Sequence, residues 1–286
     1  MKRTLSKRKT VCLYFTQHPL RTGIKTNAEL GRPMREIIAE AGISWDAWMV
    51  AIAGSFLLGV AKGGIKGFGA IITTMIALVF GSKASTGIIM PLLIVGDIFA
   101  VIYYNRHAQW AYLWKLMPWM VIGVLVGVWY GKDLPEAEFK HGMALLILSS
   151  VILMWFLDRA KNFRVPDNRL FAAIMGGISG FATMVGNLAG PFSELYFLAI
   201  RMPKEMFIGT AAWLFFITNL IKLPFHIWTW KTVNLHSVTI DLVLLPALLL
   251  GLWAGIALVK VVKQNQFRMM IMILTALGAF FILFRN

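Results

Sequence analysis

The chain has 286 residues, of which 58% are hydrophobic and only 14% are charged. Roughly a quarter of the residues of a soluble domain are charged, so this composition excludes an ordinary soluble protein. The formal net charge of +15 would suggest nucleic-acid binding in a soluble chain, but here the basic residues lie in the first 44 residues and between apolar stretches, so no nucleic-acid partner is expected.

Residues 1–44 form a basic tail in front of the apolar part. They hold nine Lys or Arg residues against three Glu residues. Positively charged segments stay on the cytoplasmic side and can contact anionic lipid, so we expect a cytoplasmic tail. The single cysteine, Cys12, lies here and leaves no disulfide within the chain. The run Val11–Phe15 is too short for a secretory signal.

Eight apolar segments follow the tail, and each approaches or exceeds the roughly 20 residues that a helix needs to cross a bilayer. Backbone groups cannot remain unpaired in lipid, so we expect all of these segments to be helical. The predicted fold class is an all-α polytopic protein of the bacterial inner membrane, with both termini cytoplasmic. The segments are 45–81, 84–104, 110–131, 141–158, 170–200, 205–228, 237–259 and 266–284.

A repeated glycine pattern indicates an internal duplication. The spacing P-x4-G-x3-G occurs at 118–127 and again at 246–255, 128 residues later. The glycine pair at 59 and 69 likewise recurs at 180 and 190. Glycines four residues apart share a helix face and permit close helix contact, so we expect them to pack helices within the chain or in a homodimer.

The duplication predicts two homologous four-helix halves. We place the first at 45–158 and the second at 170–286, joined by a charged cytoplasmic linker at 159–169. Each half opens with a long element that glycine interrupts, and such paired interruptions at matching places indicate a transporter site. The distribution of Lys and Arg favours a single crossing for each long element and hence eight spans, although two inserted hairpins would give much the same sequence.

The stretches GVAKGGIKGFGA, PLLIVGDIFAVIYYNRHAQW, GFATMVGNLAGP and FIGTAAWLFFITNLIKLPFH carry a family resemblance through their order and spacing. Over 45–284 the chain resembles the sulfite exporter (TauE/SafE) family of membrane permeases. The resemblance implies two related halves, each opening with a broken helix, and transport of sulfite or of an organosulfur anion such as a sulfonate. Lys62 and Lys66 interrupt the usual run of glycines, so the resemblance points to the anionic class rather than to one anion.

Lys62 and Lys66 lie four residues apart within the glycine-rich run. On a helix they would share a face, and in an unwound segment they would still point into one cavity. Two ammonium groups beside Gly63 and Gly64, with free backbone N–H groups and a nearby helix N-terminus, suit an oxyanion. We therefore predict an anion-binding site here; the alternative is that one or both lysines reach the membrane surface by snorkelling.

Asp97 and Asn219 lie within apolar segments of the two halves, 122 residues apart, which is also the offset between Gly87 and Gly209. Polar residues at equivalent depths can flank a central site, so Asn219 is predicted to bind the substrate. Asp97 is predicted either to carry a coupled proton or to pair with a lysine, and the sequence leaves both alternatives open.

Four further residues complete the predicted site. Asn187 and Glu194 flank Pro191 in the second broken element. Asn187 is predicted to bind the anion, because a neutral donor does not repel it, and Glu194 to act as a proton carrier or as a structural partner. Lys222 and His226 are predicted to take part in charge coupling, with anchoring at the membrane surface as the alternative for His226.

The chain contains no Walker A, HExxH or Gly-x-Ser-x-Gly sequence, so no ATP hydrolysis, metal site, cofactor or hydrolase chemistry is expected. The expected function is secondary transport of a small anion by alternating access, with a co-transported proton or cation as an option. The alternatives are a passive anion channel, an enzyme that transfers an acidic head group, and a scaffold that does not transport.

Overall fold

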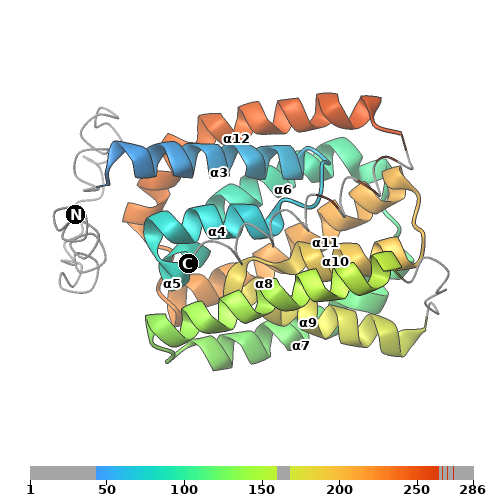
Figure 1. Ribbon diagram of the computed structural model, residues 1–286, viewed down its shortest axis with the longest axis horizontal. Coiled ribbons are helices and arrows are strands. Elements are labelled where there is room, and N and C mark those ends of the chain that lie inside the picture. The colour runs from blue at the N-terminus through green and yellow to red at the C-terminus, as the bar shows by residue number, and fades with distance from the viewer. Residues whose placement is uncertain (1–42, 160–167, 264–265, 267–268, 270–272, 274–286) are drawn as a thin grey trace. The chain divides into compact units, whose positions relative to one another are not determined.

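The computed structural model describes residues 43–159 and 168–263, together with 266, 269 and 273 (Figure 1). Within these ranges every regular element is helical. Most of the predicted tail 1–44, linker 159–169 and final segment 266–284 lies outside the described residues. The helices are α3 (Trp45–Lys62), α4 (Gly69–Phe80), α5 (Ser82–Ile88), α6 (Met90–Tyr104), η1 (Asn105–His107), α7 (Trp110–Gly131), α8 (Glu136–Arg159), α9 (Arg169–Gly186), α10 (Ala189–Ala199), α11 (Lys204–Pro224), the π-helical turn η2 (Phe225–Thr229) and α12 (Leu235–Val261).

Five of the described helices are long and apolar enough to cross a membrane, or six if the bent pair α4–α5 counts as one span. The five are α3, α7, α9, α11 with η2, and α12. Large apolar side chains point outward from them, as Trp129 at 81% exposure and Trp253 at 73% illustrate, and this suits contact with lipid. The predicted count of eight spans is not confirmed for the described part of the chain.

The predicted interruptions are present, but each long element is a hairpin. The chain reverses at residues 63–68, and α4 returns along α3, so that a methyl group at Gly54 would lie 3.1 Å from the side chain of Ile76 (Figure 1). In the second half α10 returns along α9, and the rings of Phe171 and Tyr196 are 5.4 Å apart. The second arm of each element turns back at the break, as the alternative of two inserted hairpins requires, and the number of membrane crossings per element stays a prediction.

The returning arms are too short to cross the membrane alone. Helix α4 has 12 residues and α10 has 11, which at 1.5 Å per residue gives about 18 Å and 17 Å. A bilayer core is about 30 Å thick. Gly81, with φ of 86°, then turns the chain by 110° from α4 into α5. Both hairpin tips therefore end inside the protein.

Glycines join α7 to α9 in a parallel pair. A methyl group at Gly180 would lie 2.0 Å from the carbonyl oxygen of Met120, and one at Gly176 would lie 2.8 Å from that of Leu116. A methyl group at Gly123 on α7 would lie 2.1 Å from the carbonyl oxygen of Gly177. Only glycine permits this approach, so the prediction that these glycines pack helices is confirmed.

The same arrangement joins α3 to α12. A methyl group at Gly59 would lie 2.0 Å from the carbonyl oxygen of Leu248, and one at Gly251 would lie 2.0 Å from that of Phe56. The repeated glycine motif of each half therefore packs against the hairpin of the other half. The two faces are used inside the chain and are not available to a homodimer.

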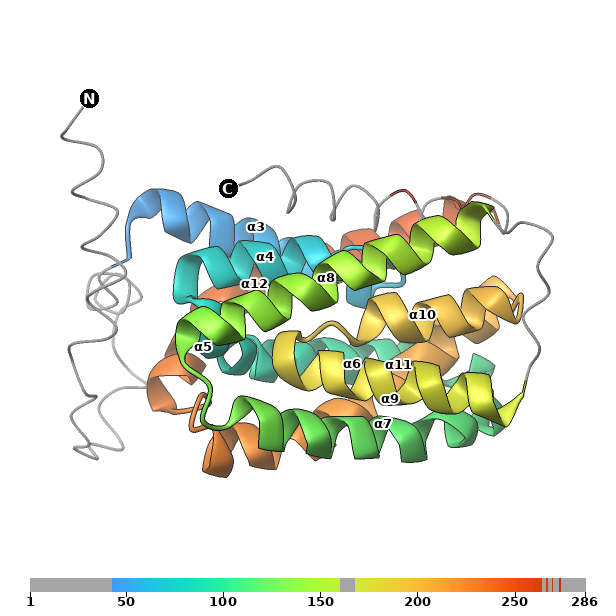
Figure 2. The ribbon, with the colours of Figure 1, turned by 60° about the horizontal axis from the view of Figure 1, so that its bottom comes forward.

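Helices α6 and α11 run antiparallel to each other. Gly209, near the start of α11, lies against the end of α6, where a methyl group would be 2.8 Å from the carbonyl oxygen of Tyr104. Further along α11, Asn219 meets Asp97 in the middle of α6. Figure 2 shows α6 and α11 among the hairpin arms, and they bring the two halves into contact at the site.

Gly180→Ala and Gly177→Ala test the glycine contact on one helix. A methyl group at Gly180 overlaps the backbone of α7, whereas one at Gly177 meets no atom within 4 Å. We expect Gly180→Ala to lower the free energy of unfolding by about 1–3 kcal/mol. Gly177→Ala should leave it unchanged or raise it by up to about 1 kcal/mol, because alanine favours helix. Thermal unfolding in detergent measures both, and equal effects would contradict the packing.

Candidate functional site

A cavity of about 80 Å³ lies between the two hairpin tips and helices α6 and α11. A water molecule needs roughly 10–15 Å³ of such space, so the cavity has room for a small polyatomic ion. Apolar side chains make up much of its wall, among them those of Leu58, Ile72, Leu93 and Phe215. The polar side chains of the wall are Lys62, Lys66, Thr73, Thr183, Asn187, Glu194, Thr218 and Asn219.

Two short helices begin at this cavity. Gly67, Phe68 and Gly69 of the first tip and Ala189 and Gly190 of the second line it, and these residues open α4 and α10. Neither helix has a side chain that caps its N-terminus. The free N–H groups and the positive end of the helix dipole favour an anion at such a place. The arrangement therefore offers two helix N-termini to one ligand.

Lys66 is the ammonium group most available to a ligand. It lines the cavity and is only 3% exposed. Its Nζ lies 5.5 Å from the ring centroid of Phe215, and no hydrogen bond to another described residue satisfies it. A buried ammonium group without a hydrogen-bond acceptor is unfavourable, so a bound anion would stabilise it. Snorkelling of Lys66 to the surface does not occur.

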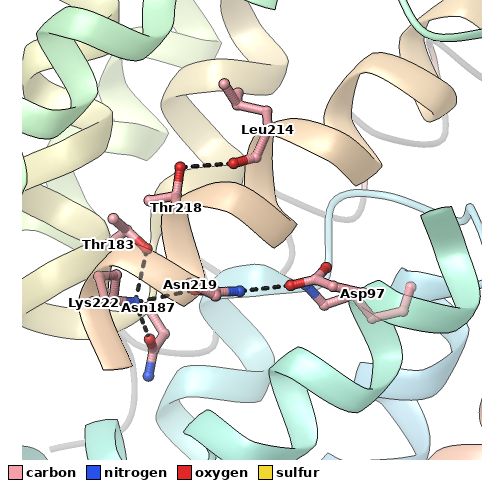
Figure 3. Close-up of polar contacts among 8 residues, drawn as sticks. Asp97, Thr183, Asn187, Leu214, Thr218, Asn219 and Lys222 are labelled. Atoms are coloured by element: carbon pink, nitrogen blue, oxygen red, sulfur yellow. Dashed lines mark hydrogen bonds and ion pairs between the residues drawn. The ribbon is translucent and has the colours of Figure 1, made fainter. Parts of the chain in front are cut away.

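Lys62 is paired instead. Its Nζ lies 2.5 Å from one carboxylate oxygen of Asp97, which is fully buried. The other oxygen of Asp97 accepts a hydrogen bond from Asn219 Nδ2 at 2.7 Å (Figure 3). Asp97 thus pairs with a lysine, as one predicted alternative required, and it connects α3 and α6 to α11. Lys62 still lines the cavity beside this pair.

Lys222 forms the second polar cluster (Figure 3). Its Nζ donates to Asn187 Oδ1 at 2.6 Å, to Thr183 Oγ1 at 3.1 Å and to Asn219 Oδ1 at 3.4 Å. Three acceptors match the three donors of an ammonium group. Asn187 adopts a left-handed conformation with φ of 55° at the end of α9, and its Nδ2 donates to the carbonyl of Thr86. The cluster thus fixes the second hairpin tip.

Glu194 faces Lys66 across the cavity region and accepts a hydrogen bond from the backbone of Gly67. It is 5% exposed and links α10 to the first hairpin tip. Lys62, Lys66 and Lys222 oppose Asp97 and Glu194, so the buried cluster holds three ammonium groups and two carboxylates. One positive charge is in excess when all five groups are ionised.

Three predicted site residues lie elsewhere. Gly63 packs against α12, and Gly64, with φ of 118°, lies against the hydroxyl of Tyr104; neither lines the cavity. Their role is to let the first hairpin tip turn and pack. His226 is fully buried, so the anchoring alternative does not hold, and its Nδ1 lies 2.8 Å from Thr232 Oγ1, away from the cavity. In the described ranges no group of three or more His, Cys, Asp or Glu residues is placed to hold a metal ion.

Three threonines of the cavity wall, Thr73, Thr183 and Thr218, and the ring of Phe215 were missed from the sequence. Thr183 follows Lys62 by 121 residues, the offset between Gly59 and Gly180, and this spacing could have revealed it. Phe215, which lies within 5.5 Å of both cavity ammonium groups, carries no sequence signal that separates it from other phenylalanines.

Lys62→Met, Asp97→Leu and the double variant test the buried pair. Removing one partner leaves an uncompensated buried charge, and we expect each single substitution to cost about 3–5 kcal/mol of unfolding free energy. The double variant should recover most of that loss. The control is Glu205→Gln, because Glu205 is 48% exposed where it pairs with Lys204 at an N–O distance of 3.3 Å, and the expected change is below about 1 kcal/mol. Additive losses in thermal unfolding would argue against the coupling.

Comparison with known proteins identifies the family of this chain. No significant match was found among curated proteins or among solved structures. The family model described as sulfite exporter TauE/SafE matches residues 50–282, which is most of the chain and includes both hairpin tips. The apolar helices and this match together indicate a multi-pass membrane protein. The chain belongs to the TauE/SafE sulfite exporter family.

Proposed function

We propose that this protein is a secondary transporter that binds a small anion in the cavity between the hairpin tips. The observation that carries the proposal is the convergence of Lys66, Lys62 and the N-termini of α4 and α10 on one cavity. These groups supply positive charge and free N–H donors together, which is the arrangement that broken-helix transporters use for anionic groups. Sulfite and organosulfur anions are the substrates that the family suggests.

Alternating access would follow from two inverted halves. Helix α3 is parallel to α12, and α9 is parallel to α7, while α6 and α11 cross in opposite directions. Because α7 follows α6 and α12 follows α11 through short turns, α3 and α9 run in opposite senses (Figure 2). Corresponding helices of opposite direction support an inverted repeat, and rocking between such repeats opens a central site to either side.

The charge balance of the site favours a monoanion. One excess positive charge among the five buried groups is neutralised by one negative charge. A dianion would leave the buried cluster with a net negative charge, which is costly in a low-dielectric environment. The apolar part of the wall also suits a ligand with an apolar substituent. A sulfonate or a singly protonated sulfur oxyanion has these properties.

Lys66→Gln tests the anion site. The variant removes the unpaired ammonium group, and we expect uptake of a sulfonate into proteoliposomes to fall at least tenfold. The matched control is Lys140→Gln, because Lys140 is exposed on α8 and should leave uptake unchanged. Flux that saturates with substrate concentration would support a carrier, whereas flux that stays linear would indicate the channel alternative. Equal uptake by Lys66→Gln and wild type would refute the site.

Dimethyl sulfone, methanesulfonate and sulfate test the charge preference, because they have similar tetrahedral shapes and carry charges of 0, −1 and −2. We expect methanesulfonate to raise the unfolding temperature of the wild type more than the other two do. At 100 times Kd a ligand adds about 2.7 kcal/mol of stability. In Glu194→Gln the preference should shift toward sulfate, because one negative charge is removed. A wild type stabilised most by sulfate would contradict the charge balance.

A further inference from the structure

A second pair of buried polar groups lies apart from the anion cavity. Asp241 on α12 is 5% exposed, and neither of its carboxylate oxygens has a hydrogen-bond partner among the described residues. Trp48 on α3 is 2% exposed, and its indole N–H likewise lacks an acceptor within this part of the chain. Neither residue lines the cavity. An ionisable group within a membrane span is costly and is by default a candidate for function.

The packing of α3 on α12 brings these two residues to the same interface. Gly59 lies against Leu252 and Gly63 against Ile256, so contacting residues differ by 193 in number. The residue numbers of Trp48 and Asp241 also differ by 193. Trp48 precedes Gly59 on α3 by eleven residues, and Asp241 precedes Leu252 on α12 by eleven residues. Eleven residues are close to three helical turns and return to the same helix face. The register therefore places an unused donor and an unused acid at the same level of the α3–α12 interface.

In the part of the chain that the structure describes, no charged group of the neighbouring helices balances Asp241. Helices α3, α5 and α6 pack against α12. On α3, Asp46 is exposed and Lys62 is bound to Asp97 of α6. On α5, Lys83 donates to the carbonyl of Lys132. On α12 itself, His236 is exposed near the start of the helix and Lys260 is exposed at the far end.

The surroundings of Asp241 suit a proton better than a metal cation. A cation such as Na⁺ or Ca²⁺ takes several oxygen ligands, often more than one of them a carboxylate, and within the described residues Asp241 belongs to no group of three or more His, Cys, Asp or Glu residues. The neighbouring Trp48 presents a donor, which repels a cation but can stabilise a carboxyl group directly or through water. A carboxyl oxygen that binds a proton becomes neutral and loses most of its desolvation cost.

We propose that Asp241, assisted by Trp48, is the binding site of a proton that is co-transported with the anion. The step is the addition of one proton to the Asp241 carboxylate and its later release, without any other bond change. This inference rests on the proposed transport of a monoanion. One proton and one monoanion carry no net charge together, so wild-type transport is insensitive to membrane voltage.

Asp241→Asn tests the proposal, because asparagine has the same shape and cannot release a proton. Wild type and variant are reconstituted in vesicles with an enclosed pH dye and supplied with methanesulfonate. With methanesulfonate supplied outside, we expect wild-type flux to acidify the lumen in step with the entry of the anion, whereas alkalinisation would contradict co-transport. The variant should move the anion with at least tenfold less proton movement and should become voltage-dependent. The exposed acid Asp46 supplies the control, Asp46→Asn, which should behave as wild type.

Infrared spectroscopy gives a second readout that does not depend on transport. The carbonyl band of a protonated carboxylic acid should be present in the wild type and in Asp46→Asn, and should lose intensity in Asp241→Asn. Unchanged proton movement in Asp241→Asn would overturn the proposal, as would coupling to a Na⁺ gradient that the variant loses. If the wild type moves no anion, the proposed function fails, while the infrared band still decides whether Asp241 holds a proton.

Discussion

Every charge that this protein buries in its membrane part must find compensation, and the arrangement of the site follows from that constraint. Asp97 is compensated by Lys62 and by the amide of Asn219. Lys222 is compensated by three neutral oxygens, including that of Asn187. Lys66 has no hydrogen-bond acceptor of its own among the described residues, and it borders the cavity. The ammonium group of Lys66 thus lies where a bound ligand can accept its hydrogen bonds.

Backbone N–H and C=O groups inside a membrane protein also need partners. A helix that ends inside a membrane leaves N–H groups that need acceptors, and only protein or a ligand can provide them there. The first tip is satisfied in part by Glu194, which accepts from Gly67, and the second is joined to α4 by the hydrogen bond from Thr73 to Gly186. The glycine contacts of α3 with α12 and of α7 with α9 fix the helices that end at the two hairpin tips. An anion between them would complete the pairing.

The two hairpin tips differ chemically. At the offset of 121 residues that separates Gly59 from Gly180, Lys62 corresponds to Thr183 and Lys66 corresponds to Asn187. All four side chains line the cavity. Thr183 and Asn187 also accept hydrogen bonds from Lys222, so an ammonium group lies close to each tip.

The sequence by itself determined the membrane class, the helical content, the interruptions near residues 63 and 187 and the grouping of Lys62, Lys66, Asn187, Asn219 and Glu194. These features depend on local hydrophobicity, on glycine and on the cost of buried charge, which act over short stretches of chain. Only the tertiary structure decided that each interrupted element is a hairpin, because a break permits the chain either to continue or to reverse. It also decided which lysine is paired, that Gly63 and Gly64 lie outside the cavity wall, and that Trp48 and Asp241 lie at the same level of the α3–α12 interface. These outcomes depend on contacts between residues far apart in the chain, which local composition does not specify.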